Sequence, residues 1–207
     1  MTGQAITDPA SAAQVFYRKW RPSSFSQLVG QEHVSSTLRQ SLKQGRVAHS
    51  YLFCGPRGSG KTTTARIIAK AVNCLDPQDG DPCNACEPCQ TINSGQYMDI
   101  IELDAASNRG IDEIRDIREK VNFAPAQGQR KVYIIDEAHM LTEAASNAFL
   151  KTLEEPPPHV IFILCTTDAH KILPKIISRD KRFDFRRRPS EQIYGRMADI
   201  TEAEGGS

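Results

Sequence analysis

Residues 51–70 read Tyr51-Leu-Phe-Cys-Gly-Pro-Arg-Gly-Ser-Gly-Lys61-Thr62-Thr-Thr-Ala-Arg-Ile-Ile-Ala-Lys70. A short apolar run comes first and predicts a strand, and a glycine-rich loop follows it. The residues after the loop predict a helix, because apolar side chains recur at helical spacing at Ala65, Ile68, Ala69 and Val72. Strand, loop and helix in this order are the structural context in which a P-loop is expected.

The residue types of this loop suit a polyphosphate. Backbone N–H groups wrap the phosphates, and glycines leave room for that approach and for the backbone angles it needs. Lys61 is placed to reach the β- and γ-phosphates and Thr62 to hold Mg²⁺, while the start of the helix favours negative charge. We therefore expect ATP to be bound by Gly55, Pro56, Arg57, Gly58, Ser59, Gly60, Lys61, Thr62 and Thr63.

The composition limits the class of protein and the number of cores that the chain can form. A chain of 207 residues can bury one substantial core, and 39% hydrophobic with 25% charged residues is typical of a soluble globular protein. No apolar run approaches a membrane span and no export signal begins the chain, so we expect a cytosolic protein. The net charge of +1 gives no overall nucleic-acid signature, although residues 179–188 carry six basic against two acidic side chains.

The N-terminal part divides into three pieces. Residues 1–14 are small, polar and aperiodic, and we expect a disordered extension there. The aromatic and basic cluster Tyr17-Arg-Lys-Trp-Arg-Pro22 could stack nucleic-acid bases or pack an arm against the domain, and its composition favours packing. An amphipathic helix follows, with Val34, Leu38 and Leu42 on one face.

A cysteine-rich insertion follows the P-loop helix, and we expect Cys74, Cys83, Cys86 and Cys89 to bind one Zn²⁺. A Cys-x2-Cys pair lets two thiolates hold one metal ion, and four thiolates close a tetrahedral site, which indicates a structural role. Disulfides are disfavoured in a reducing cytosol, and an iron–sulfur cluster is the other alternative that the spacing allows. Cys54 and Cys165 fall within apolar strands and are expected in the core.

The run Lys131-Val-Tyr-Ile-Ile-Asp136-Glu137 predicts a strand that ends in two carboxylates. Downstream of a P-loop, Asp136 can hold the Mg²⁺ shell while Glu137 orients and deprotonates the attacking water. The letters Asp136-Glu-Ala-His139 also match a helicase class, but such helicases have two tandem ATPase-type domains, which this length cannot hold. His139 has no metal-ligand partner at useful spacing and is interpreted as structural.

The remaining pattern alternates strands with helices. Strands are expected at residues 99–103, 160–165 and 183–185, and helices at 111–121, at 142–153 with Thr142 as cap, at 172–178, and from Ser190 onward. This order predicts an α/β fold with a parallel sheet and nucleotide at the carboxyl edge of the strands. Arg109 and the helix start after it could hold a DNA phosphate or could simply face solvent.

Several motifs together resemble the gamma/tau subunits of bacterial DNA polymerase III from about Val15 to the chain end. They are Tyr17-Arg-Lys-Trp-Arg-Pro22, Val29-Gly-Gln-Glu32, the P-loop, the four inserted cysteines, Glu102-Leu-Asp-Ala-Ala-Ser107, Asp136-Glu-Ala-His139, Thr152-Leu-Glu-Glu-Pro156 and Thr166-Thr-Asp168. The resemblance implies an AAA+ clamp-loader ATPase, part of a DNA polymerase holoenzyme, that opens the sliding clamp and sets it on primed DNA. It implies a P-loop AAA+ domain at residues 15–188, with a parallel five-stranded sheet flanked by helices and a small zinc-binding insertion at 74–89. Residues 189–207 would begin a truncated helical lid.

The resemblance also implies roles for single residues. Lys61 and Glu137 would be catalytic, Thr167 would be the sensor at the strand end with Thr166 as the fallback, and Arg179 would act in trans on a neighbour's ATP. Ser178-Arg179 matches a Ser-Arg-Cys motif, although Asp180 replaces the cysteine here. The adenine pocket would include Arg21, Pro22 and Val29, Mg²⁺ would lie on Thr62 and Asp136, and DNA phosphates would meet Asn108, Arg109 and Arg115.

The implied partners are further gamma/tau copies, the delta and delta prime subunits, the sliding clamp and primer-template DNA, in the cytoplasm with the nucleoid and without a membrane. Without a complete lid and collar we expect a monomer with weak nucleotide binding and little turnover, and the tail Gly205-Gly-Ser207 need not be native. Two alternatives remain: a zinc-bearing adaptor that has lost hydrolysis, and a helicase fragment. The intact set of Lys61, Thr62, Asp136 and Glu137 argues against the adaptor.

Overall fold

The computed structural model describes residues 20–107, 110–188 and 190–203. The expected extension at 1–14, the Gly205–Ser207 tail, and Asn108 and Arg109 lie outside these residues. The described chain forms a five-stranded sheet in the order β2-β3-β4-β1-β5, and every neighbouring pair is parallel. Its strands are β1 (Ser50–Cys54), β2 (Ile100–Asp104), β3 (Lys131–Asp136), β4 (Val160–Thr166) and β5 (Lys181–Asp184).

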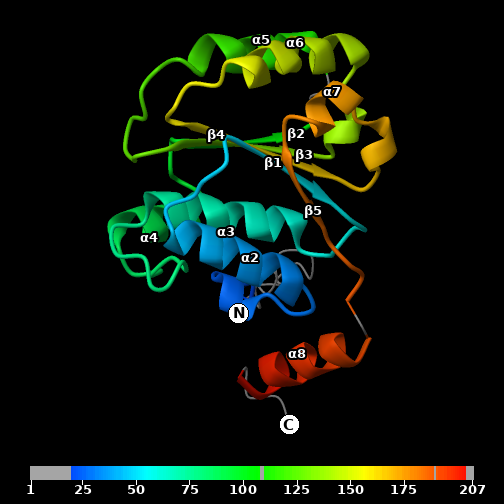
Figure 1. Ribbon diagram of the computed structural model, residues 1–207. Coiled ribbons are helices and arrows are strands. Elements are labelled where there is room, and N and C mark those ends of the chain that lie inside the picture. The colour runs from blue at the N-terminus through cyan, green and yellow to red at the C-terminus, as the bar shows by residue number, and fades with distance from the viewer. Residues whose placement is uncertain (1–19, 108–109, 189, 204–207) are drawn as a thin grey trace, which may run out of the picture.

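Helices connect the strands and cover both faces of the sheet (Figure 1). The α-helices are α2 (Glu32–Lys43), α3 (Lys61–Asn73), α4 (Glu87–Asn93), α5 (Ile111–Lys120), α6 (Glu143–Glu154), α7 (Pro174–Ile177) and α8 (Ser190–Ala203). Short 3-10 turns are η1 (Phe25–Gln27), η2 (Ala138–Met140) and η3 (Ala169–Lys171). Helices α5, α6 and α7 lie on one side of the sheet, and α2 and α3 lie on the other (Figure 1).

Alternating side chains of the central strands build the two halves of the core. Leu52 and Leu164 pack toward α5 and α6, whereas the adjacent Phe53 and Ile163 pack toward α2 and α3. Successive residues of a strand point to opposite faces, so a strand covered on both sides must be apolar throughout. Strand β4 meets this condition, since all of its residues are buried.

The predicted α/β class and parallel sheet are confirmed, and two elements begin two residues away from the expected position. Strand β5 begins at Lys181 instead of residue 183 and ends at Asp184, because an edge strand with exposed charged side chains carries little apolar pattern. The helix expected at 172–178 is shorter, because α7 begins at Pro174. Proline disfavours helical angles in the residue before it, and Leu173 has a non-helical ψ of 131°. The cap expected at Thr142 is present, and its hydroxyl accepts the N–H of Ala145 at 3.1 Å.

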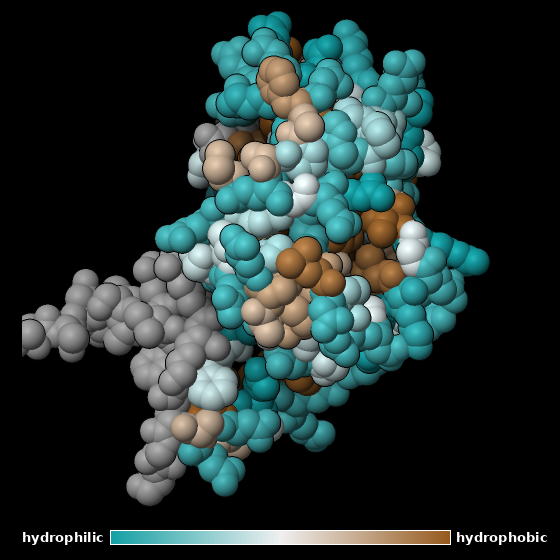
Figure 2. All heavy atoms as spheres, turned by 90° about the vertical axis from the view of Figure 1, so that its left-hand side faces the viewer, coloured by the Kyte–Doolittle hydropathy of each residue, from teal (hydrophilic) through white to brown (hydrophobic). Residues whose placement is uncertain are grey.

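Helix α8 is set apart from the body of the domain (Figure 1). Arg196 donates to the carbonyl oxygen of Trp20 at 3.4 Å, and Ile193, Tyr194 and Met197 are exposed. The face that carries the amino ends of the strands is largely hydrophilic around a central apolar area (Figure 2). Within the described ranges, no helix combines the length and the apolar character that crossing a membrane requires.

Candidate functional site

The P-loop connects the carboxyl end of β1 to the start of α3. The N–H of Gly55 donates to the Thr166 carbonyl at 3.1 Å, which fixes the loop to the end of β4. A Cβ on Gly55 would lie 2.6 Å from the carbonyl oxygen of Phe185, so only glycine fits there. Gly58 and Gly60 have φ of 76° and 98°, the left-handed region that glycine adopts without strain. The glycines are thus required by the backbone path that a phosphate cradle needs.

Lys61 is buried at the start of α3, with 6% of its surface exposed. Its Nζ donates to the carbonyl oxygens of Gly55 at 2.7 Å and Pro56 at 2.8 Å. Burial lowers the pKa of Lys61, while nearby acidic groups, Asp136 and Glu137 among them, raise it. The ammonium therefore lies within the electrostatic reach of the acidic end of β3.

Thr62 and Asp136, which are 74 positions apart, meet at this edge of the sheet. The Thr62 hydroxyl donates to Oδ2 of Asp136 at 3.0 Å. A hydroxyl and a carboxylate are the hard oxygen ligands that Mg²⁺ prefers, and carboxyl ends of parallel strands gather at one edge. The donor set fits Mg²⁺, and the pair expected from sequence to serve it is brought together.

Glu137 follows Asp136 in a left-handed conformation, with φ 51° and ψ 42°. Its N–H donates to Oδ1 of Asp136 at 2.9 Å, and its Oε2 lies 3.5 Å from Nε2 of His139. Nδ1 of His139 lies 2.9 Å from the Thr166 hydroxyl oxygen, which also accepts the N–H of Asp168 at 3.0 Å. His139 therefore links the acidic end of β3 to the end of β4.

The two threonines after β4 differ in their surroundings. Thr166, the fallback sensor, is fully buried and contacts His139, whereas the side chain of Thr167 is exposed at the same edge of the sheet. Thr166 is therefore the threonine that the described structure connects, through His139, to Glu137. Thr167 remains a prediction that rests on the resemblance.

The segment expected at the adenine lies beside the P-loop. Arg21, Pro22 and Val29 are half-buried there. Gln31 was not predicted as a site residue. It is fully buried, and its Nε2 donates to the carbonyls of Ser59 at 3.2 Å and Arg186 at 2.6 Å. The signal that could have found Gln31 is a polar residue between Gly30 and an apolar helix, a position at which an N-cap side chain is usual. Gln31 joins this segment and the chain after β5 to the P-loop.

Arg179 lies at the opposite edge of the sheet. Lys181 pairs with Tyr51 at the start of β1, so about 13 Å of strand lies between this level of the sheet and Gly55 of the P-loop, and Arg179 lies in the turn before β5. Its guanidinium pairs with Oε1 of Glu154 at 3.2 Å, beside a cavity of about 490 Å³. Asp180 accepts a hydrogen bond from the Ser50 hydroxyl, and burial raises the pKa of Asp180 to about 6. Arg179 cannot reach the P-loop of its own chain.

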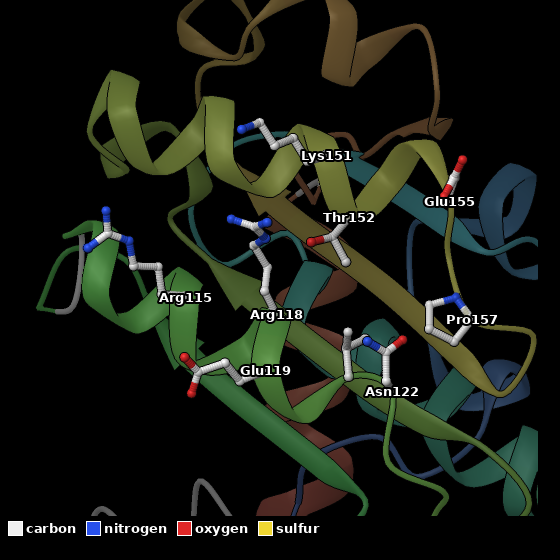
Figure 3. Close-up of a pocket in the computed structure, with 9 residues that line it drawn as sticks. Arg115, Arg118, Glu119, Asn122, Lys151, Thr152, Glu155 and Pro157 are labelled. Carbon is white, nitrogen blue, oxygen red and sulfur yellow. The ribbon is translucent and has the colours of Figure 1, made fainter.

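A second cavity of about 530 Å³ lies between α5 and α6 and contains Arg115. Arg118 extends from α5 toward α6, and Lys151 adds a third cation from α6 (Figure 3). Glu119 and Glu155 also line it. Asn108 and Arg109, the other residues expected at DNA, lie outside the described chain. We call this cavity the basic groove.

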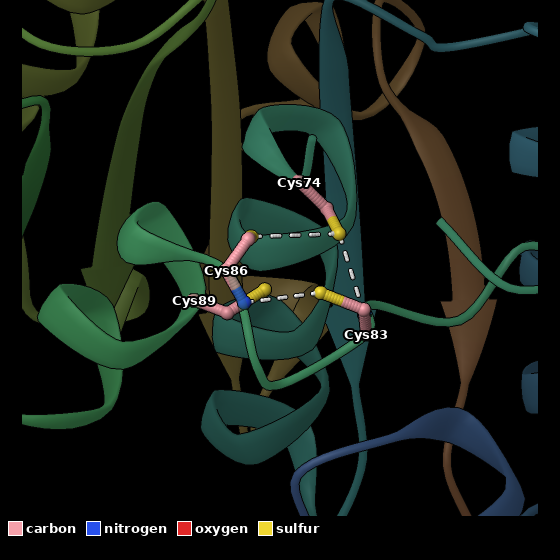
Figure 4. Close-up of side chains that lie close together, drawn as sticks. All are labelled: Cys74, Cys83, Cys86 and Cys89. Carbon is pink, nitrogen blue, oxygen red and sulfur yellow. Dashed lines mark hydrogen bonds between the residues drawn. The ribbon is translucent and has the colours of Figure 1, made fainter. Parts of the chain in front are cut away.

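The four cysteines of the insertion converge as their spacing predicts (Figure 4). All four sulfur atoms lie within 4.8 Å of one another, and those of Cys74 and Cys86 are 3.9 Å apart. Tetrahedral zinc with Zn–S bonds of about 2.3 Å requires sulfur atoms about 3.8 Å apart, so the site fits Zn²⁺. Backbone N–H groups of Ala85 and Cys86 lower the pKa of Cys83 to about 6, which favours the thiolate that zinc binds. Cys54 and Cys165 are buried in the core, as expected.

Comparison with known proteins gives one consistent relationship. A family model described as "DNA polymerase III, delta subunit" matches residues 30–189. Over 191 residues the chain is 58% identical to DNA polymerase III subunit tau of Bacillus subtilis, covering 92% of this chain and 34% of that protein. It is 47% identical over 191 residues to the tau subunit of Escherichia coli, covering 92% and 30%. The chain thus spans about a third of the length of these relatives.

Solved structures agree on the fold. A DNA polymerase III gamma subunit-related protein from Thermotoga maritima superposes with a TM-score of 0.56 at 28% identity, covering 74% of this chain and 47% of that chain. The RuvB Holliday junction branch migration motor from Thermotoga maritima has a TM-score of 0.60 at 19% identity, covering 90% and 55%, which shows the fold alone. The P-loop AAA+ fold with its inserted cysteine cluster, and the sequence identity, lead to one conclusion: the chain belongs to the DNA polymerase III subunit family and is similar to its gamma/tau members.

Proposed function

We propose that the chain is the ATP-binding and ATP-hydrolysing part of a clamp-loader motor that sets the sliding clamp on primed DNA during chromosomal replication. The observation that carries the proposal is the contact between Thr62 and Asp136, at 3.0 Å, beside the buried Lys61. Together these side chains offer one cation for the phosphates and two oxygen ligands for Mg²⁺. The location would be the cytoplasm.

In this proposal each residue near the P-loop has one task. The backbone of Gly55–Gly60 wraps the phosphates, Lys61 neutralises the β- and γ-phosphates, and Glu137 takes a proton from the attacking water. Bound Mg²⁺ would stabilise the charge that develops on the phosphate oxygens. Since His139 contacts both Glu137 and Thr166, the position of the Glu137 carboxylate depends on the end of β4.

Arg179 would complete the site of an adjacent subunit. Its place at the far edge of the sheet supports action in trans, because about 13 Å of strand lies between the start of β5 and the P-loop of the same chain. An arginine supplied by a neighbour makes hydrolysis depend on assembly. The neighbours would be further gamma/tau copies, delta and delta prime.

The basic groove would hold phosphates of primer-template DNA. Three cations, Arg115, Arg118 and Lys151, line it on two helices, while Glu119 and Glu155 limit how strongly it attracts anions. Phosphate contacts of this kind position DNA without reading its sequence. That suits a motor that must act at any primed site.

Mixing two variants tests the proposal, in complexes assembled from the chain and its proposed partner subunits. Glu137→Gln removes the base and Arg179→Ala removes the cation, so each variant alone should hydrolyse ATP slowly. Mixed complexes should recover turnover, because an intact Glu137 site then faces an intact Arg179 of its neighbour. No recovery would contradict the role of Arg179 in trans. A wild-type complex that binds ATP and does not hydrolyse it would favour the non-motor adaptor.

A further inference from the structure

We propose that the cysteine module, residues 74–89, positions the segment that closes the nucleotide pocket, and that Asp81 and Asn84 are the positioning residues. The N-terminal segment, residues 21–31, contacts the module near its start and the P-loop at its end. Zinc would thus act on nucleotide binding without touching the nucleotide. This inference rests on the proposed nucleotide-binding function.

The first contact joins Asp81 to the backbone of the N-terminal segment. The N–H of Phe25 donates to Oδ1 of Asp81 at 2.6 Å, and both residues are buried. Phe25 is the first residue of η1, where a short helix leaves its N–H groups without internal partners. Oδ2 of Asp81 lies 3.4 Å from Nε of Arg39 on α2. One carboxylate therefore connects the module, the segment and α2.

The second contact joins Asn84 and Lys70 to Ser23. Nζ of Lys70 donates to the Ser23 carbonyl at 2.7 Å and to Oδ1 of Asn84 at 2.6 Å, and Nδ2 of Asn84 donates to the same carbonyl at 3.1 Å. Lys70 is only 3% exposed. A buried ammonium needs such partners, since leaving it unpaired is costly. These three residues therefore hold one another in place.

The other end of the N-terminal segment lies on the P-loop. Gln31 donates to the Ser59 carbonyl at 3.2 Å, and the Leu28 side chain lies 4.0 Å from the position that a Cβ on Gly60 would occupy. Phe25 and Leu28 are buried in the same core cluster as Ala65 of α3. A shift at Ser23–Phe25 would therefore be transmitted over a few residues to Ser59 and Gly60.

The module depends on its metal for this shape. Asp79 and Asn84 have φ of 52° and 57°, left-handed angles that Asp and Asn tolerate in turns, so turns and not a helix or strand shape this part of the loop. Cys74 ends α3 and Cys89 lies in α4, so a metal held by both would fix the loop between them. Metal binding to four thiolates can supply the free energy that a short polar loop lacks. Without it, Asp81 and Asn84 would lose their positions.

The test compares matched variants of the full chain by zinc content, amide hydrogen exchange and affinity for a fluorescent ATP analogue. Asp81→Ala and Asn84→Gly remove the side-chain contacts, and glycine keeps the backbone angle of residue 84. Asp79→Asn is the control, because Asp79 belongs to the same turn but, among the described residues, its carboxylate pairs with Arg39 and Lys43 of α2 and with no residue of the N-terminal segment. Asp81→Asn keeps an oxygen for the Phe25 N–H and should behave like the wild type.

We expect every variant to retain one zinc per chain. Asp81→Ala and Asn84→Gly should speed exchange at Phe25, Ser59 and Gly60 and weaken nucleotide binding by about tenfold, as for loss of one buried hydrogen bond. Chelating the zinc should reproduce both changes. The inference is overturned if exchange at Ser59 and Gly60 stays at the wild-type rate in these variants, or if Asp79→Asn has the same effect. Lys61→Ala separates the two claims: if it binds ATP as the wild type does, the proposed function fails, while the exchange rates still decide the positioning role.

Discussion

At the scale of single residues, the site concentrates unfavourable conformations and buried charges. Glu137 adopts a left-handed backbone, and Lys61 is an ionisable group placed where burial opposes its charge. Strained backbone angles persist only where neighbouring groups impose them. Such angles, and ionisable groups with shifted pKa values, are most common at functional sites. In Glu137 the conformation puts its N–H on Asp136 and its carboxylate beside His139.

Magnesium dependence tests the role of Thr62. Thr62→Val removes the hydroxyl and keeps the shape, so the gain in ATP affinity on adding Mg²⁺ should fall by about tenfold. Thr62→Ser keeps the hydroxyl and should retain the gain. Titrations of an ATP analogue with Mg²⁺ and with EDTA measure the difference. Equal Mg²⁺ dependence in all three proteins would remove Thr62 from the metal site.

Asp180 predicts a pH dependence of stability. Its pKa is raised to about 6 in the folded chain, so the folded state binds the proton more tightly than the unfolded state does. The contribution of Asp180 to stability is therefore fully present below about pH 4 and is lost as the pH rises through about 6. Asp180→Asn should remove this decrease and raise the free energy of unfolding at pH 7 by about 1–3 kcal/mol. Urea unfolding of the wild type and Asp180→Asn at pH 4.5 and 7 measures this difference. If the free energy of unfolding changes equally with pH in both proteins, the prediction is wrong.

At the scale of elements, apolar periodicity located the buried strands because a strand covered on both faces leaves no polar position. The start of strand β5 could not be located in this way, because its side chains are largely exposed and only its backbone pairs with β1. Helix α4 was also not expected, because its seven residues fall within and after the cysteine-rich insertion, where no apolar repeat is visible. Helix caps, in contrast, depend on residues close together in the sequence, so the N-cap at Thr142 could be predicted.

The cap of α6 gives a prediction at this scale. Thr142→Ala removes the acceptor for the N–H of Ala145 and should lower the free energy of unfolding by about 1 kcal/mol, a fall in Tm of about 3 °C. Thr142→Ser keeps an acceptor and should stay close to the wild type. Thermal unfolding followed by circular dichroism compares them. If serine and alanine destabilise equally, the hydroxyl is not the source of the stability.

At the scale of the whole molecule, the parallel sheet brings the side chains of the candidate nucleotide site together at one edge. The meeting of Thr62 and Asp136 could be predicted from sequence, because the carboxyl ends of parallel strands must lie together. The contacts of Gln31, Asp81 and Asn84 could not be predicted. They join segments far apart in the chain, and no periodic pattern in the sequence indicates that these segments meet. The sheet also keeps Arg179 away from its own P-loop, as the proposed action on a neighbour's ATP requires.

The basic groove yields a prediction for DNA binding. Arg115→Ala should weaken binding to primer-template DNA of any sequence and reduce the slope of log affinity against log salt by about one. Arg46→Ala removes an exposed cation after α2, on the other face of the sheet, and should change neither quantity. Fluorescence anisotropy at several salt concentrations provides both slopes. An identical effect of the two variants would place the DNA elsewhere.

The most direct test of the central claim is the equilibrium affinity of the chain for Mg²⁺·ATP, measured for the wild type, Lys61→Ala and Glu137→Gln. The P-loop account predicts that Lys61→Ala loses binding by at least about tenfold, while Glu137→Gln binds as the wild type does, because Glu137 acts on the water and not on the nucleotide. Equal affinities of Lys61→Ala and the wild type would contradict the account.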